Sequence, residues 1–148
     1  MSAYRHILIA TDLTVDTEAL LDKAKRLMTT TTKLSLIHAV RPMETTYFGT
    51  MPYVPIIIDG EEVENRVIEA KKEHFEALIK DHKLKKAEWR LEIGKPATMV
   101  KEYAEENLCD LIIIGSHGEK GVRALLGSTA TGVLHDAPCD VLAVRVYN

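Results

Sequence analysis

The segment Asp-Leu-Ile-Ile-Ile-Gly-Ser-His-Gly at residues 110–118 is an apolar run that ends at two closely spaced glycines. Its apolar part, residues 111–114, is typical of a buried strand in a parallel sheet, and Gly115 marks the end of that strand. A second step of small residues, Gly127-Ser128-Thr129, opens a predicted helix. Glycines let a backbone approach an anion closely, and the N–H groups at a helix start attract negative charge. The segment therefore predicts a strand, a loop and a helix around a phosphate group.

Short apolar runs alternate with longer amphipathic runs along the rest of the chain. This alternation predicts an α/β fold, an open five-stranded parallel sheet with helices on both faces, as one domain over residues 1–148. Strands are predicted near residues 6–12, 34–40, 87–93, 110–114 and 140–146, and helices near residues 16–29, 61–82, 97–107 and 128–135. The residues predicted to face inward are Leu20, Ala24, Leu27 and Met28 in the first helix, and Val63, Val67, Ala70, Phe75, Leu78 and Ile79 in the long helix.

Composition restricts the class of protein. The 148 residues carry a formal net charge of −3, whereas general nucleic-acid binders are usually clearly basic. The two cysteines, Cys109 and Cys139, provide neither a disulfide framework nor the spacing of metal ligands. No apolar stretch approaches the length of a membrane span, and residues 1–6 lead directly into a predicted strand without a signal peptide. We expect a cytoplasmic protein that binds neither nucleic acid nor membrane.

Several motifs, which together cover nearly the whole chain, resemble those of universal stress proteins of the UspA superfamily. The resemblance implies a flavodoxin-like or Rossmann-like sheet with strand order 3-2-1-4-5, usually in a homodimer. For the nucleotide-binding branch of the family, it implies ATP or another adenine nucleotide as ligand, with or without Mg²⁺. The motifs are Ile-Leu-Ile-Ala-Thr-Asp at 7–12, Leu-Ser-Leu-Ile-His at 34–38, Gly-Lys-Pro-Ala at 94–97, the segment at 110–118, Leu-Leu-Gly-Ser-Thr-Ala at 125–130 and Ala-Pro-Cys-Asp-Val-Leu-Ala-Val-Arg at 137–145.

The nucleotide-binding branch of that family holds ATP with a Gly-x2-Gly-x9-Gly-Ser/Thr motif. Gly115 and Gly118 match its first half, and the Gly127-Ser128-Thr129 step matches its second half. The spacer here is residues 119–126, which is eight residues and one fewer than in the motif. Such a shorter spacing resembles UspA-type members, some of which hold no nucleotide. Two functions therefore stay open, an adenine-nucleotide sensor of stress and a nucleotide-free stress adaptor that works through protein–protein contacts.

The phosphates of the nucleotide would be held by main-chain N–H groups and two hydroxyls. Because ligands of open α/β sheets bind at the carboxyl ends of the strands, both halves of the motif are correctly placed for this role. The structural alternative is that Gly115 only ends a strand and that Ser128 only caps a helix. The residues concerned are Gly118, Gly127, Ser128 and Thr129.

Four further residues complete the predicted site. Asp12 ends the first strand at the same crevice and would contact the base or ribose, or else cap the following helix. Ala39 and Ile114 would line an adenine slot, although apolar residues serve a core equally well. His117 lies inside the loop and would contact phosphate or ribose, whereas His38 ends an apolar strand and is predicted to be a core histidine.

The sequence lacks residues that phosphoryl transfer requires. No Gly-x4-Gly-Lys-Ser/Thr motif supplies a lysine for a γ-phosphate, and neither a carboxylate pair for a metal nor a His-x-Gly-His signature is present. Since phosphoryl transfer depends on positioning and charge neutralisation, we expect no enzyme, or at most a very weak ATPase, and no catalytic or metal-ligating residues.

Two regions are predicted to meet other chains. The last strand, from Val141 to Val146, is an apolar sheet edge that a homodimer would protect by pairing it with its twofold mate. The segment from Arg41 to Gly60 holds three prolines but is too apolar for a simple linker. We expect it to fold over the sheet edge or to contact an unidentified protein partner.

Overall fold

The computed structural model describes residues 3–41, 60–116 and 126–146, apart from the side chains of residues 60 and 61. None of the helices in these ranges is both long and apolar enough to cross a membrane. The elements, in chain order, are β1 (His6–Ala10), α1 (Thr17–Leu27), β2 (Lys33–Val40), α3 (Gly60–Asp81), β3 (Glu88–Ile93), α4 (Pro96–Glu106), β4 (Leu111–Gly115), α5 (Ser128–Leu134) and β5 (Asp140–Val144).

The five strands form one sheet in the order β3-β2-β1-β4-β5, and every neighbouring pair is parallel. The predicted fold class and strand order are therefore confirmed. The chain moves outward from β1 through β2 to β3, and then returns to place β4 on the other side of β1. In open α/β sheets, ligands bind outside the carboxyl ends of the strands at which the strand order reverses, and these strands are here β1 and β4.

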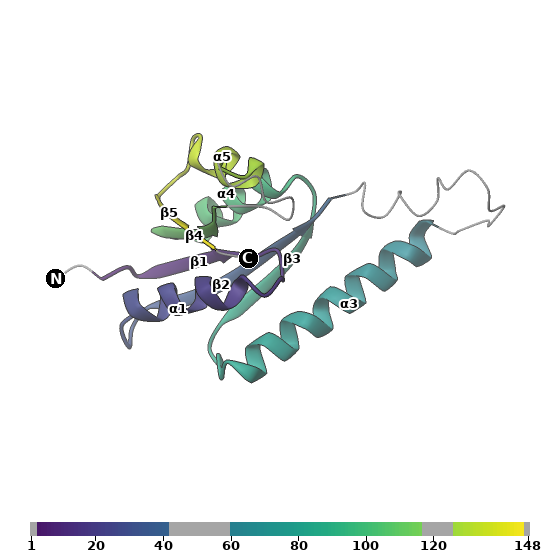
Figure 1. Ribbon diagram of the computed structural model, residues 1–148, viewed down its shortest axis with the longest axis horizontal. Helices are drawn as coiled ribbons and strands as arrows, with labels where there is room; N and C mark the ends of the chain where they lie inside the picture. Colours follow the sequence, from purple (N-terminus) through teal and green to yellow (C-terminus); the bar gives the residue numbers. More distant parts are fainter. Residues whose placement is uncertain (1–2, 42–59, 117–125, 147–148) are drawn as a thin grey trace.

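Helices cover both faces of this sheet (Figure 1). Alternate residues of β1 serve the two layers, as the period of a strand requires. Ile7 and Ile9 pack in the cluster beneath α1 and α3, and Leu8 and Ala10 pack in the cluster beneath α4 and α5. All five residues of β1 are buried, which explains why its sequence is a continuous apolar run rather than an alternating one.

The predicted inward faces of two helices need small corrections. Leu27 is 37% exposed, whereas Leu21, which was not predicted, is fully buried. Ala70 in α3 is likewise exposed. Helical periodicity gives the direction of an apolar stripe but not its width, so a residue at its margin can be exposed. The helix start was placed correctly, since Asp16 occupies the N-cap position of α1, but its side chain makes no capping hydrogen bond.

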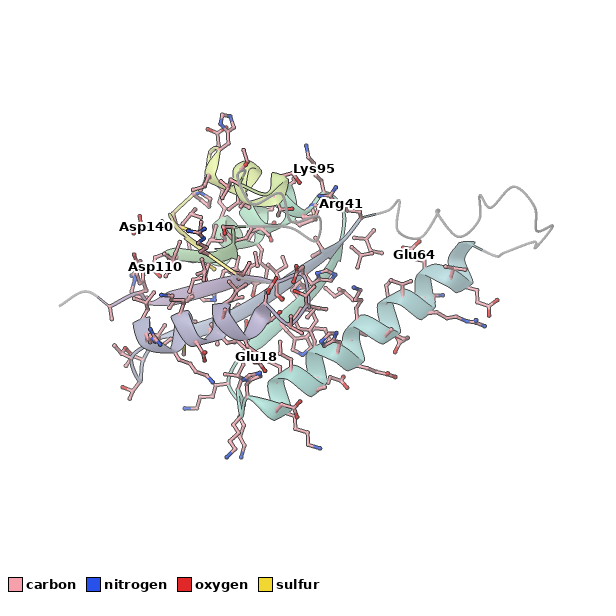
Figure 2. The ribbon with its side chains drawn as sticks, in the orientation of Figure 1. Glu18, Arg41, Glu64, Lys95, Asp110 and Asp140 are labelled. Carbon is pink, nitrogen blue, oxygen red and sulfur yellow. The ribbon has the colours of Figure 1, made fainter. Side chains whose placement is uncertain are left out.

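A carboxylate ties the amino-terminal edge of the sheet together. Asp110 accepts hydrogen bonds from the amides of Arg5 and His6, both at 2.9 Å, and so fastens β1 to β4. Burial alone would raise the pKa of Asp110, but these two amides, its own amide and the charge of Arg5 together hold the pKa below its ordinary value. Figure 2 shows Asp110 and Asp140 on this edge, the latter accepting from the Tyr4 hydroxyl at 3.0 Å.

Candidate functional site

The strand register brings three predicted or adjacent site residues to one level. Ala10 pairs with Ile37 of β2 on one side and with Ile114 of β4 on the other. Two residues further along these three chains are Asp12, Ala39 and Ser116. Because neighbouring strands lie about 4.8 Å apart, the register places these residues at one level over about 10 Å, with Asp12 and Ser116 past the ends of β1 and β4 and Ala39 still within β2. Asp12 and Ala39 thus lie beside the end of the strand that carries the glycine motif.

The two halves of the glycine motif meet at Ser116. Its amide donates to the carbonyl of Val144 at 2.8 Å, which extends the β4–β5 pairing by one residue. Its carbonyl accepts from the amide of Gly127 at 2.7 Å. The chain before residue 117 and the chain after residue 125 are therefore joined directly by a hydrogen bond. The Gly127 amide, which is predicted to meet phosphate, therefore has an acceptor within the protein, and the role of Gly127 at a nucleotide site stays a prediction.

The start of α5 presents further N–H groups beside this junction. The first bond of the helix runs from the Thr131 amide to the Gly127 carbonyl at 2.9 Å, and Gly127 itself occupies the N-cap position. The amides of Ser128, Thr129 and Ala130 precede that bond, so they have no acceptor within the helix. Ser128 is not the N-cap residue, so the alternative that Ser128 only caps this helix is wrong. With only seven residues, α5 contributes individual N–H groups rather than a large dipole.

The Ser116 hydroxyl is a site group that the sequence analysis missed. Its oxygen is buried, yet no group in the described part of the chain forms a hydrogen bond with it. Leaving a buried hydroxyl unpaired costs about 1–3 kcal/mol, and a bound polar ligand would remove that cost. The sequence offered only one indication that Ser116 belongs to the site, namely that it directly follows Gly115, the first glycine of the motif.

Asp12 is held in a defined position by the loop between β1 and α1. Its Oδ1 accepts from the Thr14 amide at 3.0 Å and from the Thr14 hydroxyl at 2.7 Å, so it does not cap α1. Its Oδ2 receives no hydrogen bond from any described residue and stays available. The next residue, Leu13, has a left-handed φ of 60° although it is not glycine. Its amide donates to the Thr11 hydroxyl at 2.9 Å, which helps to hold this strained turn.

The three apolar or histidine positions are buried. The Nδ1–H of His38 donates to the Thr11 carbonyl at 2.8 Å, as expected for a core histidine. Ile114 packs in the same cluster as Ala130 beneath α5, so its side chain serves the core alternative. Ala39 is 8% exposed and belongs to neither core cluster. Both predicted slot residues are therefore buried, and only Ile114 belongs to one of the two core clusters.

Two cations stand near this edge of the sheet. Arg41 follows β2 and Lys95 precedes α4, and both side chains are exposed (Figure 2). A hydrogen bond from the Gly94 amide to the Val40 carbonyl, at 2.9 Å, keeps the end of β2 next to the end of β3. Within the described ranges, no group of three or more His, Cys, Asp or Glu residues could hold a metal ion. The predicted contacts of His117 and Gly118, and most of the segment from Arg41 to Gly60, lie outside the described residues.

Comparison with known proteins places the chain in a family. The model of the universal stress protein family matches residues 3–145. The chain belongs to that family. Among its relatives, universal stress protein A homolog 2 of Coxiella burnetii is 35% identical over 148 residues, which cover 99% of this chain and 98% of the relative.

Solved structures of universal stress proteins share the fold. The hypothetical protein MJ0577 superposes with a TM-score of 0.82 at 25% identity, and 99% of each chain is covered. A universal stress protein in complex with cAMP has a TM-score of 0.60 at 23% identity, covering 97% of this chain and 98% of the other. One from Archaeoglobus fulgidus in complex with dAMP has a TM-score of 0.56 at 20% identity, covering 96% and 98%. Because these last two proteins are only 23% and 20% identical to this chain, their similarity shows a shared fold.

Proposed function

We propose that this universal stress protein binds an adenine nucleotide, with ATP as the first candidate, and reports its occupancy to partner proteins in the stress response. The ligand would lie in the crevice outside the carboxyl ends of β1 and β4. Two family members of the same fold were solved with cAMP and with dAMP, which supports an adenine nucleotide as the ligand class. We further propose that the protein works in the cytoplasm and does not bind nucleic acid or membrane.

The observation that carries this proposal is the 2.7 Å bond from the Gly127 amide to the Ser116 carbonyl. It brings the two small-residue steps to one point, so that the Ser116 hydroxyl from the first step and the N–H groups at the start of α5 can face one ligand. The phosphates would meet the amides of Ser128 and Thr129 and the Ser116 hydroxyl. The free Oδ2 of Asp12 would accept from a ribose hydroxyl or the base, since a carboxylate repels phosphate.

Binding without efficient turnover follows from the groups available. In P-loop enzymes, a lysine of the phosphate-binding loop and a firmly held metal ion neutralise the charge of the transferring phosphoryl group. The sequence has no P-loop lysine, and the described residues offer no metal cluster. We therefore propose that the protein is not an enzyme, or at most a very weak ATPase.

We also propose a homodimer that pairs through β5. The Val144 carbonyl accepts from the Ser116 amide, so the backbone of Val144 faces β4. Backbone groups alternate in direction along a strand, and those of Ala143 therefore face away from β4, toward the outer edge of the sheet. Ala143 is exposed in the single chain. An edge strand of this kind is a hazard that a twofold mate would remove.

The test begins with the protein as purified. Heating it and separating the supernatant by anion-exchange chromatography would reveal a released adenine nucleotide. Calorimetric titration with ATP, with and without Mg²⁺, should then give saturable binding to the emptied protein. Absence of both released nucleotide and binding heat would contradict the proposal.

A matched pair of variants locates the site. Ser116→Ala removes a hydroxyl that has no partner in the described part of the protein, so the fold should be unaffected. ATP affinity should fall about three- to tenfold, the value of one ordinary hydrogen bond. Thr30→Ala removes an exposed hydroxyl at the opposite edge of the sheet and should leave affinity unchanged. If the unmodified protein and both variants bound ATP with equal affinity, the nucleotide would not contact the Ser116 hydroxyl.

A nucleotide-free adaptor is the second candidate, and the same bond favours it. The Gly127 amide is already satisfied by Ser116, which leaves one fewer donor for phosphate than the glycine motif suggests. The eight-residue spacer, residues 119–126, points in the same direction. An adaptor would remain a folded dimer and would bind no nucleotide in either assay.

A further inference from the structure

A second concave site lies at the opposite edge of the sheet from the candidate nucleotide site. It is a pocket of about 320 Å³, open to solvent and lined by residues from the end of α3, the turn that follows α3 and the start of β3. Figure 1 shows where α3 and β3 lie. Trp89 is the second residue of β3, so the pocket opens at the amino ends of the strands. The lining residues are Glu76, Ile79, Lys80, Lys83, Lys85 and Trp89.

The base of the pocket is apolar and rigid. Trp89 stacks on Phe75, with ring centroids 5.0 Å apart and ring planes inclined by 15°. Phe75 is completely buried, so it fixes the plane of the indole ring from the core side. Trp89 and Ile79 both pack against the core cluster and are only half-buried. Part of each side chain is therefore left to contact something outside the protein.

The rim of the pocket is cationic. Lys80, Lys83 and Lys85 oppose a single carboxylate, that of Glu76, which leaves a formal excess of two positive charges. All four side chains are exposed. None of the ion pairs between described residues includes any of these three lysines. Other lysines of the same region are paired, as Lys72 is with Glu69.

We propose that this pocket binds a small amphipathic carboxylate, in which one aromatic ring or one short alkyl chain carries a single acid group. The apolar body would lie against Trp89 and Ile79, and the carboxylate would lie among the lysine ammonium groups. The charge excess selects an anion, and the apolar base selects a ligand that is not merely an inorganic ion. The pocket is open to solvent, so only the part of the ligand that lies against Trp89 and Ile79 has to be small. This site is separate from the proposed nucleotide site and does not depend on it.

Trp89 supplies a direct readout because it is the chain's one tryptophan. Titration with 4-phenylbutyrate and with octanoate should change its fluorescence saturably, and the tighter of the two probes identifies the ring or the chain as the preferred body. The neutral analogues 4-phenylbutan-1-ol and 1-octanol should bind at least about tenfold more weakly, since they lack the charge. Equal binding of acid and alcohol, or an absence of saturation with both acids, would overturn the proposal.

Paired lysine variants separate a local site from general charge. The double variant Lys83→Gln, Lys85→Gln should weaken binding of the preferred acid at least about fivefold. The control, Lys71→Gln with Lys72→Gln, removes the same charge from α3 at residues that do not line the pocket. It should change affinity less than about twofold. An equal loss in the two double variants would show a diffuse electrostatic effect and would overturn the site.

Discussion

Replacing Gly132 by alanine should displace the helix that carries half of the candidate site. Gly132 lies in α5 and packs against Ala97 of α4 so closely that an added Cβ would lie 2.7 Å from the Ala97 Cβ. Ordinary carbon–carbon contacts are about 3.5–4.0 Å, so α5 must retreat by about 1 Å. Ala97 is a short side chain on a helix and cannot turn away. The displacement should carry Ser128 and Thr129 with it.

Two opposing effects determine the change in stability. Overpacking costs about 1–3 kcal/mol, and replacing a helical glycine by alanine recovers about 1 kcal/mol. Gly132→Ala should therefore lower the free energy of unfolding by about 1 kcal/mol, measured by urea denaturation followed at Trp89. Combining it with Ala97→Gly removes the clash, and the double-mutant cycle should give a favourable coupling of about 1–2 kcal/mol. ATP affinity should fall in the single variant and recover in the double variant.

The reasoning fails if the cycle gives a coupling within about 0.3 kcal/mol of zero, the level expected of residues that do not interact. It also fails if Gly132→Ala keeps full stability and full ATP affinity. Thr131→Ala is the control, because it changes an exposed neighbour on the same helix whose hydroxyl makes only a long bond, 3.5 Å, to the Leu126 carbonyl, and it should leave both quantities nearly unchanged.

Three other substitutions or measurements test separate parts of the structure. Asp110→Ala should lower the free energy of unfolding by about 2 kcal/mol at pH 7, because two backbone amides lose a charged acceptor. The lowered pKa of Asp110 makes that stabilisation complete above about pH 4 and lost as the pH falls further, so urea titrations at pH 7 and pH 3 should give unequal losses. Ala143→Pro should turn the dimer into a folded monomer in sedimentation experiments, since it removes an outward N–H while sparing the β4–β5 ladder; a persistent dimer would exclude β5 as the interface. Burial raises the pKa of the Cys109 thiol to about 12, so iodoacetamide should alkylate Cys109 only after unfolding, and rapid labelling of the native protein would contradict its burial.

The fold was predictable because the apolar runs and their spacing are determined by local physics. Strands such as residues 111–114 are buried on both faces, and the sequence records this as uninterrupted apolar character. Leu27 and Ala70 were misplaced because helical periodicity shows the direction of a stripe but does not show its width.

The candidate site was only partly predictable. Its position at the carboxyl ends of β1 and β4 followed from topology, and Asp12 was found in that way. The acceptor of the Gly127 amide was not predictable, because the bond to Ser116 joins two loops whose approach depends on the packing of α5 against α4. The orphaned Ser116 hydroxyl was missed for a similar reason, since burial of a single oxygen is a property of the assembled fold.

The most direct test is an amide-resolved NMR titration of the labelled protein with ATP. Binding at the joined glycine motif predicts that the largest shifts occur at Ser116, Ser128 and Thr129, with a second group in the loop around Asp12. Amides around Trp89, at the opposite edge of the sheet, should remain unshifted. Shifts confined to other regions, or no shifts at saturating ATP, would contradict a nucleotide site built from these two loops.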